Sequence, residues 1–266
     1  MTSDEPSKTA SAEAGGRLGD RLAGQVALVT GASSGIGRAI ALAFLREGAD
    51  LVVVARRAER LNALAEQAQH LGRACRLVTG DVREEDTASR ATQAALDHFG
   101  KLDLLVNNAG VGIYKPLEET SPDEYDTMMD SNMRSTFLFT RYVVPILTRQ
   151  GSGVIINVSS MAGVMGFPGE AVYCATKFAQ VGFTQALDRE LRPRGIRVGV
   201  LCPGGVKTEF AIGTGRTEES VAASGMLEPE DVADAALLMA TQRAGSRIIE
   251  IRLRPMIEPL AGRDPE

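Results

Sequence analysis

The sequence predicts a doubly wound α/β fold, in which one parallel β-sheet lies between two layers of helices. Short apolar runs alternate with longer stretches of helical period along almost the whole chain, an order that is typical of βαβ units. The apolar runs are continuous rather than alternating, as expected of parallel strands that are covered on both faces. A chain of 266 residues with 44% hydrophobic residues can bury the core that such a sandwich needs.

Seven β-branched or Leu-rich runs are the expected strands. In chain order they are VALVT (26–30), DLVVVA (50–55), CRLVTG (75–80), LDLLVNN (102–108), GVIINVSS (153–160), IRVGVLCPG (196–204) and SRIIEIRL (246–253). Stretches of helical period between them predict helices that begin near Gly35, Ala58, Glu84, Pro122, Ala171 and Pro229. Together these elements predict a single-domain, Rossmann-type sandwich of three α/β/α layers.

The predicted domain covers residues 25–255. The first 24 residues are rich in Ser, Ala, Gly and charge and have no apolar period, so we expect them to form a disordered leader. Residues 256–266 are the expected C-terminal tail. The longest irregular stretch inside the domain, residues 204–226, follows the carboxyl end of a strand, which is where open α/β sheets bind ligands.

Composition argues against several classes of function. The 29 basic side chains are scattered and are outnumbered by 34 acidic ones, so the net charge of −5 disfavours a nucleic-acid partner. No run approaches the roughly 18 consecutive apolar residues of a membrane helix, so we expect no membrane span. The 3 cysteines are far apart and show neither a disulfide framework nor metal-ligand spacing, which predicts a cytoplasmic protein without a metal site.

A glycine turn directly follows the first expected strand. It reads Thr30-Gly31-Ala32-Ser33-Ser34-Gly35-Ile36-Gly37 and opens into an apolar helical stretch. Glycines allow the backbone to approach a pyrophosphate closely, and the free N–H groups and dipole of the helix favour an anion. The alternative is a tight turn that only packs a helix on a strand, but both flanks fit a dinucleotide site.

The end of the second strand predicts which dinucleotide this site takes. In such folds an acidic residue there accepts a hydrogen bond from the 2′-hydroxyl of the adenosine ribose. Here the place is taken by Arg56 and Arg57, whose guanidinium groups match a 2′-phosphate. We therefore expect NADP(H) rather than NAD(H), the alternative being a solvated arginine pair that starts a surface helix.

A tyrosine and a lysine four residues apart are the candidate catalytic pair. Tyr173 and Lys177 lie in a stretch of helical period, so both side chains lie on one helix face. An adjacent ammonium stabilises phenolate, which brings the pKa of a phenol toward the working range of a general acid or base. The alternative is a core tyrosine beside a lysine that reaches the surface.

These motifs occur in a fixed order with Asn107-Asn108-Ala109-Gly110 and with Ser160 thirteen residues before Tyr173. Together they make residues 25–255 resemble the classical short-chain dehydrogenase/reductase family. The ending SRIIEIRLRP looks like an NADP-preferring branch that includes 3-hydroxy-acid and clavulanate-type aldehyde reductases. The resemblance implies a catalytic set of Asn132, Ser160, Tyr173 and Lys177, with Ser159 the weaker candidate for the serine. Expected cofactor contacts are Gly31, Ser33, Ser34, Gly35, Ile36, Gly37, Arg56, Arg57, Asp81, Val82, Asn108, Ala109, Gly110, Tyr173, Lys177, Pro203, Gly204, Val206 and Thr208.

The resemblance further implies an NADP(H)-dependent oxidoreductase that interconverts a small carbonyl compound and its alcohol. In that scheme Tyr173 moves the proton, Ser160 polarises the carbonyl, Lys177 tunes the phenol and holds the nicotinamide ribose, and Asn132 holds a relay water. A homodimer or homotetramer is also implied. Two other functions fit the sequence less well: a non-catalytic NADP-binding regulator, which has no need of the catalytic set, and a nucleotide-sugar epimerase, which needs a longer C-terminal domain.

Overall fold

The computed structural model describes residues 19–243 and 245–257. Its strands are β1 (Val26–Thr30), β2 (Asp50–Ala55), β3 (Cys75–Thr79), β4 (Leu104–Asn107), β5 (Gly153–Val158), β6 (Ile196–Pro203) and β7 (Glu250–Leu253). Its α-helices are α1 (Gly35–Arg46), α2 (Ala58–His70), α3 (Glu85–Phe99), α4 (Pro122–Met129), α5 (Ser135–Gln150), α6 (Ala171–Leu191), α7 (Glu218–Ala222) and α8 (Pro229–Ala240).

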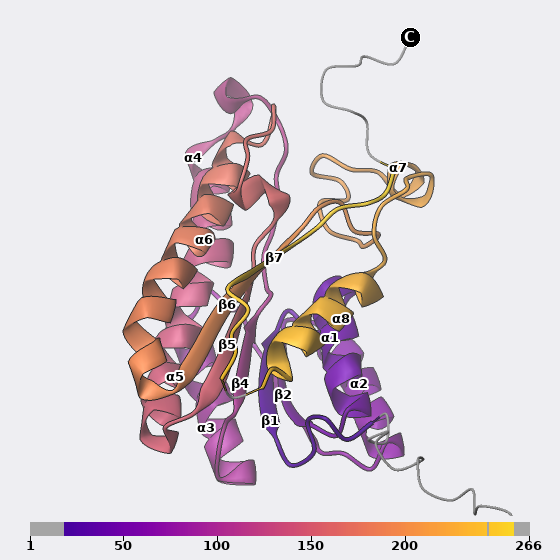
Figure 1. Cartoon of the computed structure of the whole chain (residues 1–266). Helices are drawn as coiled ribbons and strands as arrows, with labels where there is room; N and C mark the ends of the chain where they lie inside the picture. The colour runs from indigo at the N-terminus through magenta and orange to yellow at the C-terminus, as the bar shows by residue number, and fades with distance from the viewer. Residues whose placement is uncertain (1–18, 244, 258–266) are drawn as a thin grey trace, which may run out of the picture.

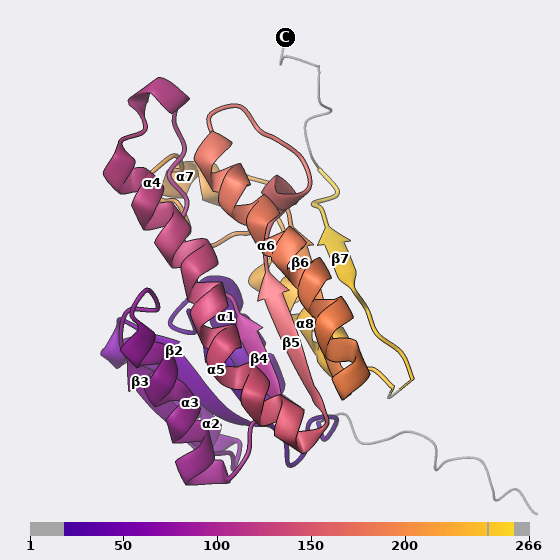
Figure 2. The same ribbon diagram turned by 90° about the vertical axis from the view of Figure 1, so that its left-hand side faces the viewer.

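The seven strands form one parallel sheet in the order β3-β2-β1-β4-β5-β6-β7. Helices α1, α2 and α8 cover one face, while α3, α5 and α6 cover the other (Figures 1 and 2). The strand order reverses between β1 and β4, which creates a crevice at their carboxyl ends. The doubly wound, three-layer sandwich predicted from the sequence is confirmed.

Burial explains why the strand predictions hold best at the centre of the sheet. All residues of β1 and β4 are buried, because helices pack on both of their faces. The edge strands β3 and β7 are only partly buried. The last strand was expected over residues 246–253, but the observed strand begins at Glu250, although the Val200 N–H already donates to the Ile249 carbonyl at 2.9 Å.

The helix expected to begin near Pro122 is followed without a break by a π-helical turn and a second α-helix. A π-helical turn (Asp130–Arg134) joins α4 to α5, so the chain stays helical from residue 122 to 150. A π-turn inserts an extra residue into the helix and often marks a functional site. The stretch 204–226, expected to be irregular, contains the short helix α7.

The chain already packs against the core of the domain at residues that precede Gln25. The Leu22 side chain is 0% exposed in the core beside α1, and the Leu22 N–H donates to the Glu47 carbonyl at 2.7 Å. The expected disordered leader therefore does not include Leu22, because this apolar side chain fills space in the core. Residues 1–18 of that leader and 258–266 of the expected tail lie outside the described residues. Every described helix is too short or too polar to cross a membrane.

Candidate functional site

The candidate site lies where the carboxyl ends of β1 and β4 separate. The hydroxyl oxygen of Thr30 accepts hydrogen bonds from the backbone N–H groups of Asn108 and Ala109 at 3.0 and 3.1 Å. The Asn108 side chain donates to the Thr30 carbonyl at 3.0 Å. These bonds hold the end of β4 against the glycine turn, so the two expected cofactor motifs form one surface.

The glycine turn leaves no space for larger residues. Gly31 has a φ of +68°, a left-handed conformation that glycine adopts without strain. A Cβ atom at Gly37 would lie 2.4 Å from the Gly31 carbonyl oxygen and 2.3 Å from Asn108 Nδ2. Ser34 precedes α1 but its hydroxyl does not cap the helix, and no acidic residue lies in the first turn. The N–H groups that no side chain caps and the helix dipole therefore suit a pyrophosphate.

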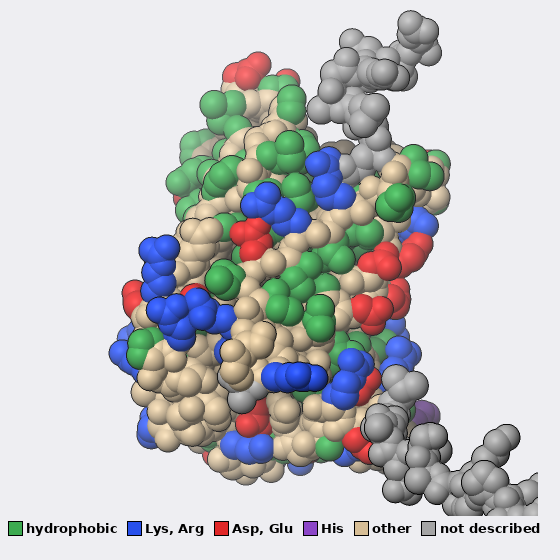
Figure 3. Space-filling model, in the orientation of Figure 1, with side chains coloured by type: hydrophobic (Ala, Val, Ile, Leu, Met, Phe, Trp, Pro, Cys, Tyr) green, Lys and Arg blue, Asp and Glu red, His purple; other side chains and the backbone are tan. Residues whose placement is uncertain are grey.

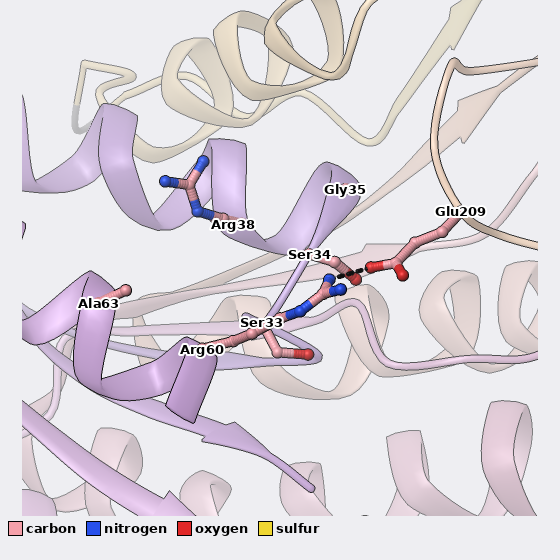
Figure 4. A pocket seen from close by; sticks show the side chains of 7 residues that line it. All are labelled: Ser33, Ser34, Gly35, Arg38, Arg60, Ala63 and Glu209. Carbon is pink, nitrogen blue, oxygen red and sulfur yellow. Dashed lines mark hydrogen bonds and ion pairs between the residues drawn. The ribbon is translucent and has the colours of Figure 1, made fainter. Parts of the chain in front are cut away.

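The expected 2′-phosphate cradle is built around Arg57. Its Nη2 donates to the hydroxyls of Ser33 and Ser34 at 3.1 and 2.8 Å. Both of its terminal nitrogens also donate to the Glu209 carboxylate, each at 3.0 Å, and Arg60 donates to the same carboxylate. Figure 4 shows Arg60 and Glu209 facing each other beside Ser34, at the edge of a depression of about 390 Å³.

The other residues expected at the adenosine end lie close by. Arg56 is exposed at the end of β2, and its charge acts on Asp81. Asp81 accepts hydrogen bonds from the Arg83 side chain at 2.7 and 3.0 Å, which holds the pKa of Asp81 below its usual value. Val82 packs against the core cluster under α3 and α5.

Tyr173 and Lys177 lie on one face of α6 and are both buried. The Tyr173 side chain is 5% exposed, and Lys177 Nζ lies 5.7 Å from the centroid of the Tyr173 ring. Burial raises the pKa of Tyr173 above its usual value, and hydrogen bonding with Ser160 and Tyr114 opposes that shift. Burial lowers the pKa of Lys177 to about 8. The expected tuning of the phenol by Lys177 stays a prediction.

Lys177 is connected to Asn132 through Gln180, a residue that the sequence reasoning missed. Lys177 Nζ donates to Gln180 Oε1 at 2.9 Å and to the Val158 carbonyl at 3.1 Å. Gln180 Nε2 donates in turn to the Asn132 carbonyl at 3.0 Å. The Asn132 side chain bonds both the N–H and the carbonyl of Val111, at 2.8 and 2.9 Å. The π-turn thus ties the helix to the loop after β4.

The two serines after β5 have different surroundings. Ser159 is buried, and its hydroxyl donates to the Lys177 carbonyl at 3.0 Å. Ser160 is half-buried, accepts a hydrogen bond from the Ala162 N–H at 3.1 Å and is hydrogen-bonded with Tyr173. This geometry agrees with the choice of Ser160 as the candidate that meets the substrate.

Two aromatic rings pack against the Tyr173 ring. The Tyr114 ring stands edge-on at 5.4 Å between centroids, and the Phe210 ring lies at 5.8 Å. The Arg216 guanidinium lies 5.7 Å from the Tyr114 ring, and its charge lowers the pKa of Tyr173. The loop after β4 and the loop after β6 are connected by the Tyr114 N–H, which donates to the Thr214 carbonyl at 2.8 Å.

The remaining expected cofactor contacts follow β4 and β6, except for Ile36, which lies in α1. A Cβ atom at Gly110 would lie 2.9 Å from Asn132 Oδ1 and 3.7 Å from Lys177 Nζ. Pro203 ends β6, and the Gly204 N–H donates to the Leu253 carbonyl at 2.8 Å. Val206 bridges to Leu227. Ile36 packs against the core next to the turn, and Thr208 contacts the glycine turn at Gly35.

A family model described as short chain dehydrogenase matches residues 25–219. An uncharacterised oxidoreductase of Staphylococcus epidermidis is 37% identical over 232 residues, which is 87% of this chain and 97% of the relative. The match therefore extends over nearly the full length of that relative.

Solved structures also match the chain over most of its length. A metagenomic short-chain oxidoreductase in complex with NADP has 34% identity and a TM-score of 0.78, with 90% of this chain and 100% of the other covered. A short chain dehydrogenase of Mycobacterium paratuberculosis bound to NAD has 26% identity and a TM-score of 0.81, with coverages of 88% and 98%. Similar chains thus bind either dinucleotide.

Proposed function

Because the chain belongs to the short-chain dehydrogenase family of oxidoreductases, we propose that it is an NADP(H)-dependent enzyme that interconverts a small carbonyl compound and the corresponding alcohol. The observation that carries the proposal is the position of Gly110. This residue follows the strand end that borders the glycine turn, and a Cβ atom there would lie 3.7 Å from Lys177 Nζ. A coenzyme in the crevice would therefore end beside the Tyr173 and Lys177 pair.

When bound, the nicotinamide supplies or accepts the hydride. The protein's part is to move a proton at the Tyr173 hydroxyl and to hold the substrate oxygen there. Ser160 is hydrogen-bonded with Tyr173, so a carbonyl oxygen that meets both hydroxyls is polarised toward the alkoxide. The Tyr114 and Phe210 rings beside Tyr173 exclude water from this reacting oxygen.

Lys177 and its hydrogen-bond partners position the proton-transfer group. The ammonium is held by Gln180 Oε1 and the Val158 carbonyl, and it would bind the nicotinamide ribose. Asn132 contributes to this arrangement through its carbonyl, which Gln180 contacts. Gln180 thus connects the Lys177 ammonium to the backbone of Asn132, and the relay water expected at Asn132 stays a prediction.

The preference for NADP(H) is supported by charge at the end of β2. Arg56, Arg57 and Arg60 lie at the adenosine end of the crevice, and Arg57 is oriented by Ser33 and Ser34. Guanidinium groups bind a phosphate with charge-assisted hydrogen bonds, whereas a 2′-hydroxyl gains little from them.

The direct test is coenzyme oxidation with a panel of aldehydes, ketones, quinones and 3-oxo acids. We expect at least one carbonyl substrate to support NADPH oxidation, and the kcat/KM with NADPH to exceed that with NADH. The loss of absorbance at 340 nm measures both rates. Stoichiometric NADPH binding without turnover of any panel member would favour the non-catalytic alternative.

The role of Gln180 gives a separate prediction. In Gln180→Leu, the Lys177 ammonium loses one of its two acceptors. Its pKa is therefore expected to fall below the value of about 8, because hydrogen bonds to the charged form favour that form. The alkaline limb of kcat against pH is expected to move to lower pH, and kcat to fall about tenfold or more. In Gln180→Glu the carboxylate stabilises the ammonium, so the limb is expected to move to higher pH.

Gln185→Leu is the matched control, because Gln185 lies on the exposed side of the same helix. It is expected to keep the wild-type pH profile. Equal losses in Gln180→Leu and Gln185→Leu with unshifted profiles would assign Gln180 a purely structural role.

Assembly and location are proposals of the same kind. Phe137 on α5 and Phe178 on α6 are 45% and 48% exposed, and both helices lie on the face seen in Figure 2. Hydrophobic side chains also gather over α6 and near β7 in Figure 3. These surfaces support a homodimer or homotetramer, which light scattering after size-exclusion chromatography measures.

The free state of all three cysteines supports a reducing, cytoplasmic location.

A further inference from the structure

Three consecutive residues of the loop after β6 contact three different parts of the site. Thr208 packs on the glycine turn, with its Cγ2 2.9 Å from the position of a Cβ atom on Gly35. Glu209 bonds Arg57 and Arg60. Phe210 lies against the Tyr173 ring. One short segment therefore covers the pyrophosphate turn, the 2′-phosphate cradle and the proposed proton-transfer group.

The Glu209 carboxylate makes the contacts that a phosphate would make. Each terminal nitrogen of Arg57 donates to one of its oxygens at 3.0 Å, a bidentate pair, and Arg60 donates to the same group. Hydrogen bonding to Arg57, against the opposing effect of partial burial, lowers the pKa of Glu209 to about 2. The group is thus an anion at any pH at which the enzyme works.

The anion and a 2′-phosphate compete for the same donors. Arg57 and Arg60 with Glu209 leave one net positive charge, and a phosphate monoester brings about −1.5 to −2. With Glu209 in place, a 2′-phosphate would share the Arg57 guanidinium with a second anion, and the two anions repel each other. A ribose 2′-hydroxyl carries no charge, so it meets no such competition.

We propose that Glu209 limits the preference for NADP(H) by acting as a stand-in for the 2′-phosphate: NADP(H) binds only after displacing its carboxylate from Arg57 and Arg60, whereas NAD(H) binds with that contact intact. The inference rests on the proposed function, because it assumes that the crevice takes a nicotinamide dinucleotide. Displacement also moves the neighbours of Glu209, so the 2′-phosphate loosens the cover that Thr208 and Phe210 place over the turn and over Tyr173. Glu209 thereby narrows the preference for NADP(H) that the arginines create.

The test compares Glu209→Gln with wild type in nucleotide binding, without any turnover. The probes are adenosine 2′,5′-bisphosphate and 5′-AMP, which differ by the 2′-phosphate alone, titrated by calorimetry. Glutamine keeps the shape of the side chain and removes its charge. We expect the bisphosphate to bind Glu209→Gln about tenfold or more tightly than wild type and 5′-AMP to bind both proteins equally. NADPH and NADH are expected to follow the same pattern.

Glu218→Gln is the matched control, because Glu218 is an exposed acid of the same loop region, in the first turn of α7. It is expected to leave both affinities unchanged. A second reporter uses the absence of tryptophan from the chain: in Phe210→Trp, the bisphosphate is expected to change the fluorescence of the new indole, and 5′-AMP is not.

The possible outcomes separate this inference from the proposed function. Unchanged or weaker bisphosphate binding by Glu209→Gln, or an equal gain for both nucleotides, overturns the role of Glu209 while NADPH turnover by wild type stands. If wild type binds neither NADPH nor NADH, the proposed function fails and this inference fails with it.

Discussion

Tyr173→Phe is expected to lower kcat by about 10²- to 10⁴-fold, the range that a positioned general acid or base contributes, while NADPH affinity stays close to that of wild type. The substitution removes one oxygen atom. The Phe ring fits the same space, because Tyr114 and Phe210 enclose the existing ring at 5.4 and 5.8 Å between centroids. What is lost is the hydroxyl that is hydrogen-bonded with Ser160 and that moves the proton in the proposed function. Steady-state rates and a fluorescence titration with NADPH measure the two quantities.

Tyr142→Phe is the control for this change. Tyr142 lies on α5, where its hydroxyl donates to Glu85 Oε1 at 2.9 Å on the surface. The Tyr142→Phe substitution removes the same hydroxyl oxygen from a tyrosine outside the site, so kcat is expected to be unchanged. If Tyr173→Phe retains more than about a tenth of wild-type kcat, the proton-transfer role of Tyr173 is wrong.

The sequence predicts the fold well where packing alone decides the structure. β1 and β2 have the expected limits, because central parallel strands are continuous β-branched runs that both helical layers cover. Accuracy falls at β7, where charged and apolar residues alternate and an edge position leaves the start of pairing undecided. It also falls at the π-turn, whose extra residue leaves no mark in an apolar period that simply continues.

In the candidate site, too, the sequence predicts the contacts within one helix but not those between distant segments. Local spacing places Tyr173 and Lys177 together, and the same helical period applied to Lys177 and Gln180 indicates that those two side chains are neighbours. The contact between Arg57 and Glu209 spans 152 residues, and no local pattern indicates it. Such a contact depends on how the loop after β6 crosses the crevice, which is a property of the whole fold.

Arg56→Asp/Arg57→Ala is expected to weaken NADPH binding by about 100-fold or more, the effect of removing a bidentate charged contact and adding a repulsive charge. The structure explains the size of the effect. Arg57 is the donor that joins Ser33, Ser34 and Glu209. Its loss removes the guanidinium donor from both serine hydroxyls, while Arg60 still donates to Glu209. The new aspartate adds a second carboxylate beside Glu209, so a 2′-phosphate would meet repulsion where it now meets two guanidinium groups.

NADH is expected to respond differently to the same double change. An aspartate at the end of β2 can accept a hydrogen bond from the ribose 2′-hydroxyl, so NADH affinity is expected to hold or to rise. The control Arg189→Asp/Arg192→Ala makes the same change in charge at the far end of α6, where Arg189 and Arg192 are exposed, and is expected to leave both affinities as they are. Because net charge is matched, a loss of NADPH binding confined to the first variant assigns the effect to the cradle. Wild-type protein that binds NADH more tightly than NADPH would refute the 2′-phosphate argument outright.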